Sequence, residues 1–140
     1  MGKQEETKED FFELEGLSEY TIIKKGQPCS SHVSVKISVN DETEIQAADG
    51  IGPVYVIDSA LRKALEKFYV TDLDSMFLVD FNVHIFDGHK SAASKVRVTI
   101  EFQDESEHWT KIGISENLIK ASWLALADGF RYKLAKNGKK

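Results

Sequence analysis

The feature that most constrains the fold of this chain is an internal repeat. Apolar and glycine positions of the first half return 63 residues later: Val33 at Val96, Val35 at Val98, Ile37 at Ile100, Gly50 at Gly113, and Ile51 at Ile114. A repeat of this length indicates one supersecondary unit present twice. Two related units create a boundary between them, and such a boundary is a natural place for a ligand.

Each half shows the same order of patterns, namely three strands followed by a helix. Alternation of apolar and polar residues marks half-buried strands, and apolar residues at a spacing of three and four mark the helices. Pro53 suits the first turn of the first helix, and Ser115 is the expected N-cap of the second. The expected strands are 20–24, 31–39 with a turn at Asp41-Glu42, 44–48, 77–86, 96–102 and 109–112; the helices follow residues 53 and 115.

We therefore expect an α+β domain of two βββα units with pseudo-twofold symmetry, in which each helix covers one face of its sheet. The expected boundaries are a flexible tail over 1–16, unit one over about 17–70 and unit two over about 76–136, within a domain of 17–140.

The charge pattern argues against a nucleic-acid partner. The net charge is −5, and the acidic tail accounts for −4 of it, so the remainder is close to neutral rather than basic. The basic end at Lys133, Lys136, Lys139 and Lys140 is interpreted as a solvated helix terminus.

No apolar run reaches membrane-spanning length and no secretory signal is visible. The lone Cys29 favours a reducing cytoplasm and a structural thiol.

No catalytic signature is present in the sequence. The histidines share no metal-ligand spacing and no cysteine pair accompanies them; they are His32, His84, His89 and His108. The Gly50-Ile51-Gly52 step lacks the lysine of a phosphate-binding loop and the third glycine of a dinucleotide site.

A Gly-Ile step does precede each helix, where backbone N–H groups attract a carboxylate. With the branched neighbours Ile51, Val54 and Ile114, this pattern is typical of a site for an amino acid such as isoleucine or leucine.

Two segments resemble the C-terminal regulatory domain of the 2-isopropylmalate synthase family. They are Gly50-Ile-Gly-Pro-Val with Ser59-Ala-Leu-Arg-Lys-Ala-Leu-Glu-Lys-Phe-Tyr69, and Lys111-Ile-Gly-Ile-Ser-Glu-Asn-Leu-Ile-Lys-Ala-Ser-Trp-Leu-Ala-Leu-Ala-Asp128. Trp109, the Ala-Ser-Trp step and Tyr132-Lys-Leu are most similar to the citramalate synthase branch. The resemblance extends over about 20–134.

The resemblance implies a non-catalytic domain that dimerises and binds a pathway end-product. In the family the effector, leucine or isoleucine, inhibits an N-terminal TIM-barrel acyltransferase, which this chain is too short to include. It also implies a homodimer with no metal, no cofactor and no catalytic residue in this domain, while the composition separately favours a cytoplasmic protein with no membrane partner.

Carried over by position, the effector residues are Gly50, Ile51, Val54, Phe81, Ile85, Ala92 and Ile114. The family usually has Asn where Ile51 stands, and Gly-Thr-Ala-Ala where Lys90-Ser91-Ala92-Ala93 stands. The leading hypothesis is an allosteric domain that binds isoleucine, with leucine next. One alternative is a purely structural dimerisation domain with a vestigial pocket. Another is a stand-alone enzyme that uses Asp58, Asp80 or the histidines.

Overall fold

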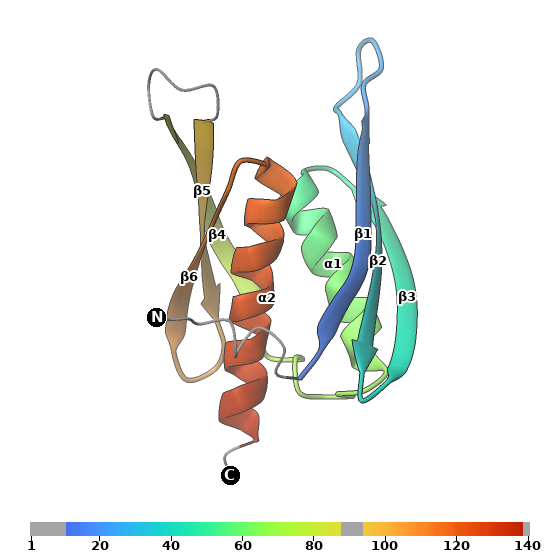
Figure 1. Cartoon of the computed structure of the whole chain (residues 1–140), viewed down its shortest axis with the longest axis vertical. Coiled ribbons are helices and arrows are strands. Elements are labelled where there is room, and N and C mark those ends of the chain that lie inside the picture. Colours follow the sequence, from blue (N-terminus) through green and yellow to red (C-terminus); the bar gives the residue numbers. More distant parts are fainter. Residues whose placement is uncertain (1–10, 88–93, 139–140) are drawn as a thin grey trace. The chain divides into compact units, whose positions relative to one another are not determined.

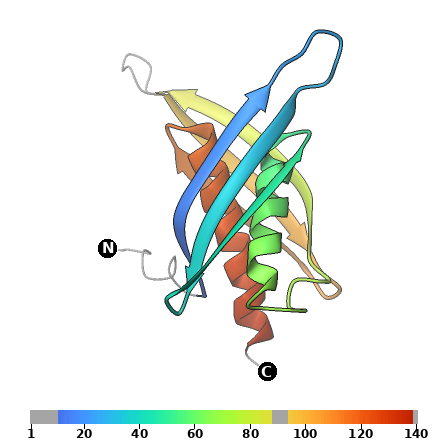
Figure 2. The same cartoon turned by 90° about the vertical axis from the view of Figure 1, so that its right-hand side faces the viewer.

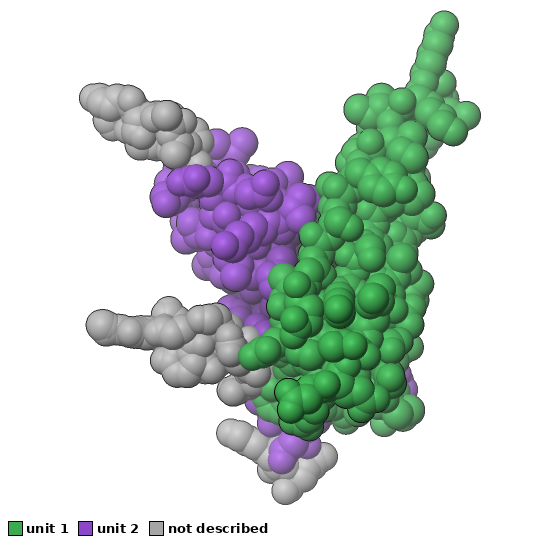
Figure 3. All heavy atoms as spheres, turned by 45° about the vertical axis from the view of Figure 1, so that its right-hand side comes forward, with its two compact units in different colours: residues 1–73 green, residues 74–140 purple. Residues whose placement is uncertain are grey.

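The computed structural model describes residues 11–87 and 94–138, and it contains two successive βββα units (Figure 1). The chain divides into unit 1, Met1–Leu73, and unit 2, Asp74–Lys140, which Figure 3 distinguishes by colour. The predicted α+β fold with a duplicated βββα order is confirmed.

Unit 1 is a three-stranded antiparallel sheet with one helix on it. The sheet has the order β1-β2-β3, and its strands are β1 (Glu13–Ile22), β2 (Ser30–Val39) and β3 (Glu42–Gly50). Helix α1 (Pro53–Glu66) packs on β2 and β3, and Figure 2 shows the strands crossing it obliquely. The alternation of β2 buries Val33, Val35 and Ile37 toward the helix, because successive side chains of a strand point to opposite faces.

Unit 2 repeats this arrangement with a longer helix. Its sheet has the order β4-β5-β6, with β4 (Phe77–Asp87), β5 (Ser94–Gln103) and β6 (His108–Ser115). Helix α2 (Leu118–Asn137) packs on β5 and β6. Both first strands carry an irregularity in register, between Leu14 and Gly16 in β1 and between Leu78 and Asp80 in β4. The duplication therefore extends to a local irregularity that the sequence pattern does not show.

Two glycines let α2 lie close to its sheet. A Cβ at Gly113 would overlap the carbonyl oxygen of Ala121 and would lie 2.9 Å from the backbone nitrogen of Ala125. A Cβ at Gly129 would overlap the ring of Phe102, whose Cδ2 would be only 2.7 Å away. Both positions therefore require a residue without a side chain.

The structure moves three of the expected boundaries. Strand β1 begins at Glu13, so the last four residues of the expected tail belong to a strand that is much longer than 20–24. The β2–β3 turn is Asn40-Asp41, one residue earlier than expected, with φ of 52° and 72°. Positive φ at both central residues is what a two-residue type I′ hairpin requires, and Asn and Asp tolerate it best among residues with a side chain.

The start of α2 also differs from the expectation. Ser115 is the last residue of β6, and the N-cap is Asn117, whose Oδ1 accepts a hydrogen bond from the Lys120 backbone N–H at 3.0 Å. Ser115 supports this cap, because its Oγ accepts a hydrogen bond from the Asn117 backbone N–H at 3.1 Å. Both residue types can cap a helix, so the sequence pattern did not distinguish them.

Candidate functional site

The β3–α1 turn places three of the predicted effector residues together. Gly50 ends β3 and pairs with Ser31, Ile51 follows with 66% of its surface exposed, and Val54 is buried in the first turn of α1. Gly52 between them has a φ of 93°, a left-handed value that favours glycine. The turn therefore presents the Ile51 side chain outward, while Val54 faces the interior.

The start of α1 has the electrostatic character of an anion site. Its N-cap Gly52 offers no side-chain hydrogen bond, and its first turn holds no acidic residue. The first intrahelical bond runs from the Val56 N–H to the Gly52 carbonyl at 3.1 Å, and Pro53 has no N–H to present. The partial positive charge of this helix end is thus not offset by a capping carboxylate, which favours a bound anion.

The equivalent turn of unit 2 is built differently. Ile114 is 47% exposed, but two backbone donors at the start of α2 are already taken by the Asn117 and Ser115 side chains. Ile114 pairs with Arg97, which alternates with the buried Val98, so Ile114 faces away from α2. The two Gly-Ile steps therefore differ in their place: Gly50 ends β3 and Ile51 lies beyond it, whereas Gly113 and Ile114 both lie within β6, and the two helix starts also differ in capping.

Two further predicted residues lie on β4. Phe81 pairs with Ile100 and Ile85 pairs with Val96, so both side chains lie on the α2 side of the sheet. Ile85 is nevertheless 68% exposed, since α2 packs mainly on β5 and β6. Phe81 and Ile85 thus share a face, whereas Ile114 lies on the opposite face of the same sheet. The remaining predicted residue, Ala92, lies outside the described residues.

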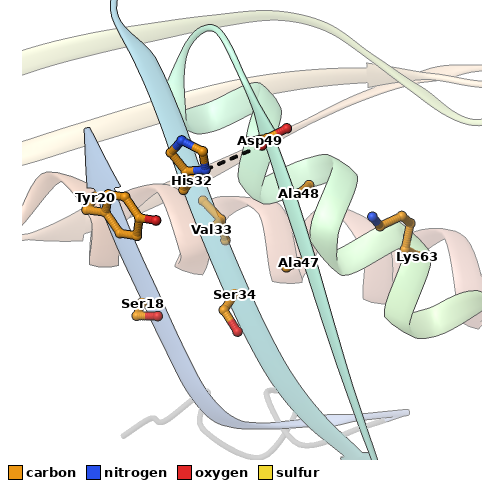
Figure 4. A pocket seen from close by; sticks show the side chains of 9 residues that line it. All are labelled: Ser18, Tyr20, His32, Val33, Ser34, Ala47, Ala48, Asp49 and Lys63. Atoms are coloured by element: carbon orange, nitrogen blue, oxygen red, sulfur yellow. Dashed lines mark ion pairs between the residues drawn. The ribbon is translucent and has the colours of Figure 1, made fainter. Parts of the chain in front are cut away.

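A shallow depression in unit 1, with both polar and apolar side chains in its lining, was not expected from the sequence. It has a volume of about 320 Å³, and its most polar part is a row of Tyr20, His32 and Asp49 across β1, β2 and β3 (Figure 4). The Tyr20 and His32 rings stack with centroids 4.9 Å apart, and His32 Nδ1 lies 3.4 Å from Asp49 Oδ2. That separation is long for a hydrogen bond and Asp49 is exposed, so the row offers polar contacts rather than a strongly coupled acid–base pair.

Unit 2 holds a buried ionic cluster instead. The Asp104 carboxylate, fully buried, accepts hydrogen bonds from Lys133 Nζ at 2.6 Å and Lys136 Nζ at 2.8 Å. Its other oxygen accepts the backbone N–H groups of Ser106 and Glu107 at 2.9 and 3.0 Å. Burial alone would raise the pKa of Asp104, but the hydrogen bonds from the two lysines, together with those from the backbone N–H groups of Ser106 and Glu107, hold the pKa well below its usual range.

The cluster corrects the interpretation of the basic C-terminal end. Lys133 is only 2% exposed and is therefore not a solvated lysine. Lys136 contacts Glu107 at 2.6 Å, and the Tyr132 hydroxyl donates to the same carboxylate at 3.0 Å. These contacts join the β5–β6 hairpin to the last turns of α2. The cluster therefore has a structural role.

Within the described residues, no group of three or more His, Cys, Asp or Glu side chains is arranged to hold a metal ion. Among the helices in that part of the chain, none combines the length and apolar character needed to cross a membrane.

Comparison with known proteins assigns the chain to a family. A family model described as the LeuA allosteric (dimerisation) domain matches residues 1–134. The chain belongs to this family. The LeuA domain is 44% identical over 108 residues to an (R)-citramalate synthase of Aquifex aeolicus, which covers 77% of the chain and 20% of that relative. It is 42% identical over 107 residues to the (R)-citramalate synthase of Geobacter sulfurreducens, covering 76% of the chain and 20% of the relative.

A more distant relative is a 2-isopropylmalate synthase of Cronobacter sakazakii, 25% identical over 126 residues, which are 90% of the chain and 21% of the relative. The LeuA domain thus spans about a fifth of the length of these relatives. The family resemblance seen in the two sequence segments is confirmed.

Proposed function

We propose that this LeuA domain is a non-catalytic allosteric module that binds a branched-chain amino acid and mediates end-product feedback inhibition. Isoleucine is the favoured effector and leucine the next. The observation that carries the proposal is the start of α1, which lacks a side-chain cap and adjoins the exposed Ile51, in a chain whose relatives are named citramalate and isopropylmalate synthases.

The chemistry of the turn suits an amino acid. The effector's carboxylate would lie at the positive end of α1, where no acidic side chain of the first turn competes with it. Its branched side chain would contact Ile51. Phe81, Ile85 and Ile114 stay sequence-based candidates, with Ile114 on the opposite face of the unit 2 sheet from the other two. Isoleucine and leucine differ only in the position of one methyl group, which a pocket distinguishes by about 1–3 kcal/mol. The preference for isoleucine is supported by the citramalate synthase names of the relatives above 40% identity.

The longer protein would be a cytoplasmic homodimer in which the domain controls a TIM-barrel acyltransferase that uses acetyl-CoA. The effector would act by binding one conformation of the domain more tightly than another, because only differential affinity can shift an equilibrium. The expected activity of the longer protein, acetyl transfer from acetyl-CoA to pyruvate, should be absent from the 140-residue chain assayed alone.

Calorimetric titration of the chain with isoleucine, leucine and valine tests the effector. We expect saturable heat with isoleucine, and an affinity at least ten-fold weaker for the Ile51→Ser variant. Ile23→Ser is the matched control, because Ile23 is also well exposed, at 77% against 66% for Ile51, but lies in the β1–β2 loop. Absence of both heat and a thermal shift with all three amino acids would reject the effector hypothesis.

The alternative is a purely structural dimerisation domain with a vestigial pocket. Two observations favour it: Ile51 stands where the family usually has Asn, and the start of α2 is capped by Asn117. Sedimentation should give about twice 15.8 kDa under either hypothesis. A dimer that binds none of the three amino acids would support the alternative. A persistent monomer would contradict both the effector hypothesis and the alternative.

A further inference from the structure

Tyr69, just beyond the end of α1, contacts the two residues that precede β1, Phe11 and Phe12 (the entering segment), through Phe11. The Tyr69 hydroxyl donates a hydrogen bond to the Phe11 carbonyl oxygen at 2.8 Å, across 58 positions of sequence. The two rings also meet edge to face, with centroids 6.5 Å apart and planes at 70°. Tyr69 is itself fixed to the helix, because its backbone N–H donates to the Leu65 carbonyl at 2.8 Å.

Phe11 is held in a conformation that it would not adopt alone. Its φ is 76°, a left-handed value that is uncommon for a residue with a Cβ and costly for a bulky one. The next residue, Phe12, is 1% exposed, so its buried side chain anchors the backbone directly after Phe11. A phenylalanine keeps a left-handed backbone conformation only where surrounding contacts hold it there. Here those contacts are the ones with Tyr69 and the burial of Phe12.

A cavity beside these contacts leaves room for an alternative arrangement. It has a volume of about 450 Å³ and is bordered by Phe11, Tyr69 and the β2–β3 turn at Asn40-Asp41. A strained backbone beside open space can relax when the contacts that hold it are broken, which is the property of a two-state element.

We propose that the Tyr69–Phe11 contact is a latch that couples α1 to the entering segment. The candidate effector turn and the latch lie at opposite ends of one helix of 14 residues, so that displacement of α1 by an effector is passed to Phe11. This coupling rests on the proposed function at the start of α1. The latch itself does not, because it rests only on the contacts between Tyr69 and Phe11.

Hydrogen exchange on the 140-residue chain separates the latch from the coupling. In the first arm, without effector, Tyr69→Phe removes the hydroxyl and keeps the ring. We expect exchange at residues 12–14 to rise roughly two- to twelve-fold, the range for loss of one neutral hydrogen bond. The matched control is Tyr20→Phe, which changes an exposed hydroxyl on β1 away from the latch. Equal exchange in the two variants and the wild type would overturn the latch.

In the second arm, exchange at residues 12–14 is compared with and without saturating isoleucine. The wild type should show a change, and Tyr69→Phe should bind isoleucine within three-fold of the wild-type affinity yet lose that change. An unchanged segment in the wild type with bound isoleucine, or the same response in the variant, would overturn the coupling. Absence of isoleucine binding to the wild type would instead reject the proposed function. The exchange measured in the first arm, without effector, would still show whether the latch exists.

Discussion

Replacement of Asp104 by asparagine tests the buried ionic cluster directly. Asparagine keeps the volume of the side chain, and its carbonyl oxygen can still accept the backbone N–H groups of Ser106 and Glu107. The negative charge between Lys133 and Lys136 is lost. Lys136 retains Glu107 at 2.6 Å, but Lys133 is left with the exposed Glu105 at 3.9 Å.

The magnitude follows from the burial of Lys133, whose side chain is 3% exposed. Removing one partner of a buried ion pair leaves an uncompensated charge and costs about 3–5 kcal/mol. We expect a loss of unfolding free energy in that range for Asp104→Asn. Replacing both partners, as Asp104→Asn with Lys133→Met, should recover much of the loss because no isolated charge remains buried.

The pH dependence has a defined sign. The pKa of Asp104 is depressed in the folded state, so the folded protein holds this proton less tightly than the unfolded chain. The contribution to stability is therefore complete above the unfolded pKa, about 3.9, and is lost as pH falls below it. The wild type should lose more stability than Asp104→Asn as the pH is lowered through this range.

Urea unfolding followed by tryptophan fluorescence measures the change, because Trp109 and Trp123 both lie in unit 2. The matched control is Asp41→Asn, the equivalent position of unit 1, where the side chain is exposed and the φ of 72° suits asparagine. We expect the control to change stability by less than about 0.5 kcal/mol. Equal effects at the two positions would refute the argument.

Two further substitutions test the packing and the cap of α2. Gly129→Ala should cost about 1–3 kcal/mol or more, because its Cβ would overlap the Phe102 ring, whereas Gly138→Ala, with 3.5 Å to the nearest atom, should be tolerated in the same thermal melts. A stable Gly129→Ala protein would contradict the close approach of α2. Asn117→Ala should cost about 1 kcal/mol through loss of the bond to the Lys120 N–H, and a denaturant midpoint equal to the wild type would show that Ser115 suffices as the cap.

The fold was predictable because its signals are local. Alternation at Val33, Val35 and Ile37 specifies a strand with one buried face, and the same pattern 63 residues later specifies its copy. The Gly52-Pro53 step marks the start of α1 for reasons that lie within the backbone of those two residues. These features need no knowledge of distant partners.

Features that depend on distant partners were mispredicted or missed. Lys133 was interpreted as solvated because its partner, Asp104, lies 29 positions away. Strand β1 was expected to start late, because its beginning is defined by pairing with distant residues of β2, Glu13 with Ser38 and Leu14 with Ile37. The row of Tyr20, His32 and Asp49 exists only through the register of three strands.

The sequence by itself determined the duplicated βββα order and the place of each Gly-Ile step before a helix. Only the tertiary structure decided that these two helix starts differ, since Asn117 caps α2 while Gly52 leaves α1 without a side-chain cap. It also decided on which face of its sheet Ile114 lies, because strand register assigns each side chain to one side. Periodicity specifies local conformation, whereas the partner of a charge or a helix end depends on which distant segments the fold brings together.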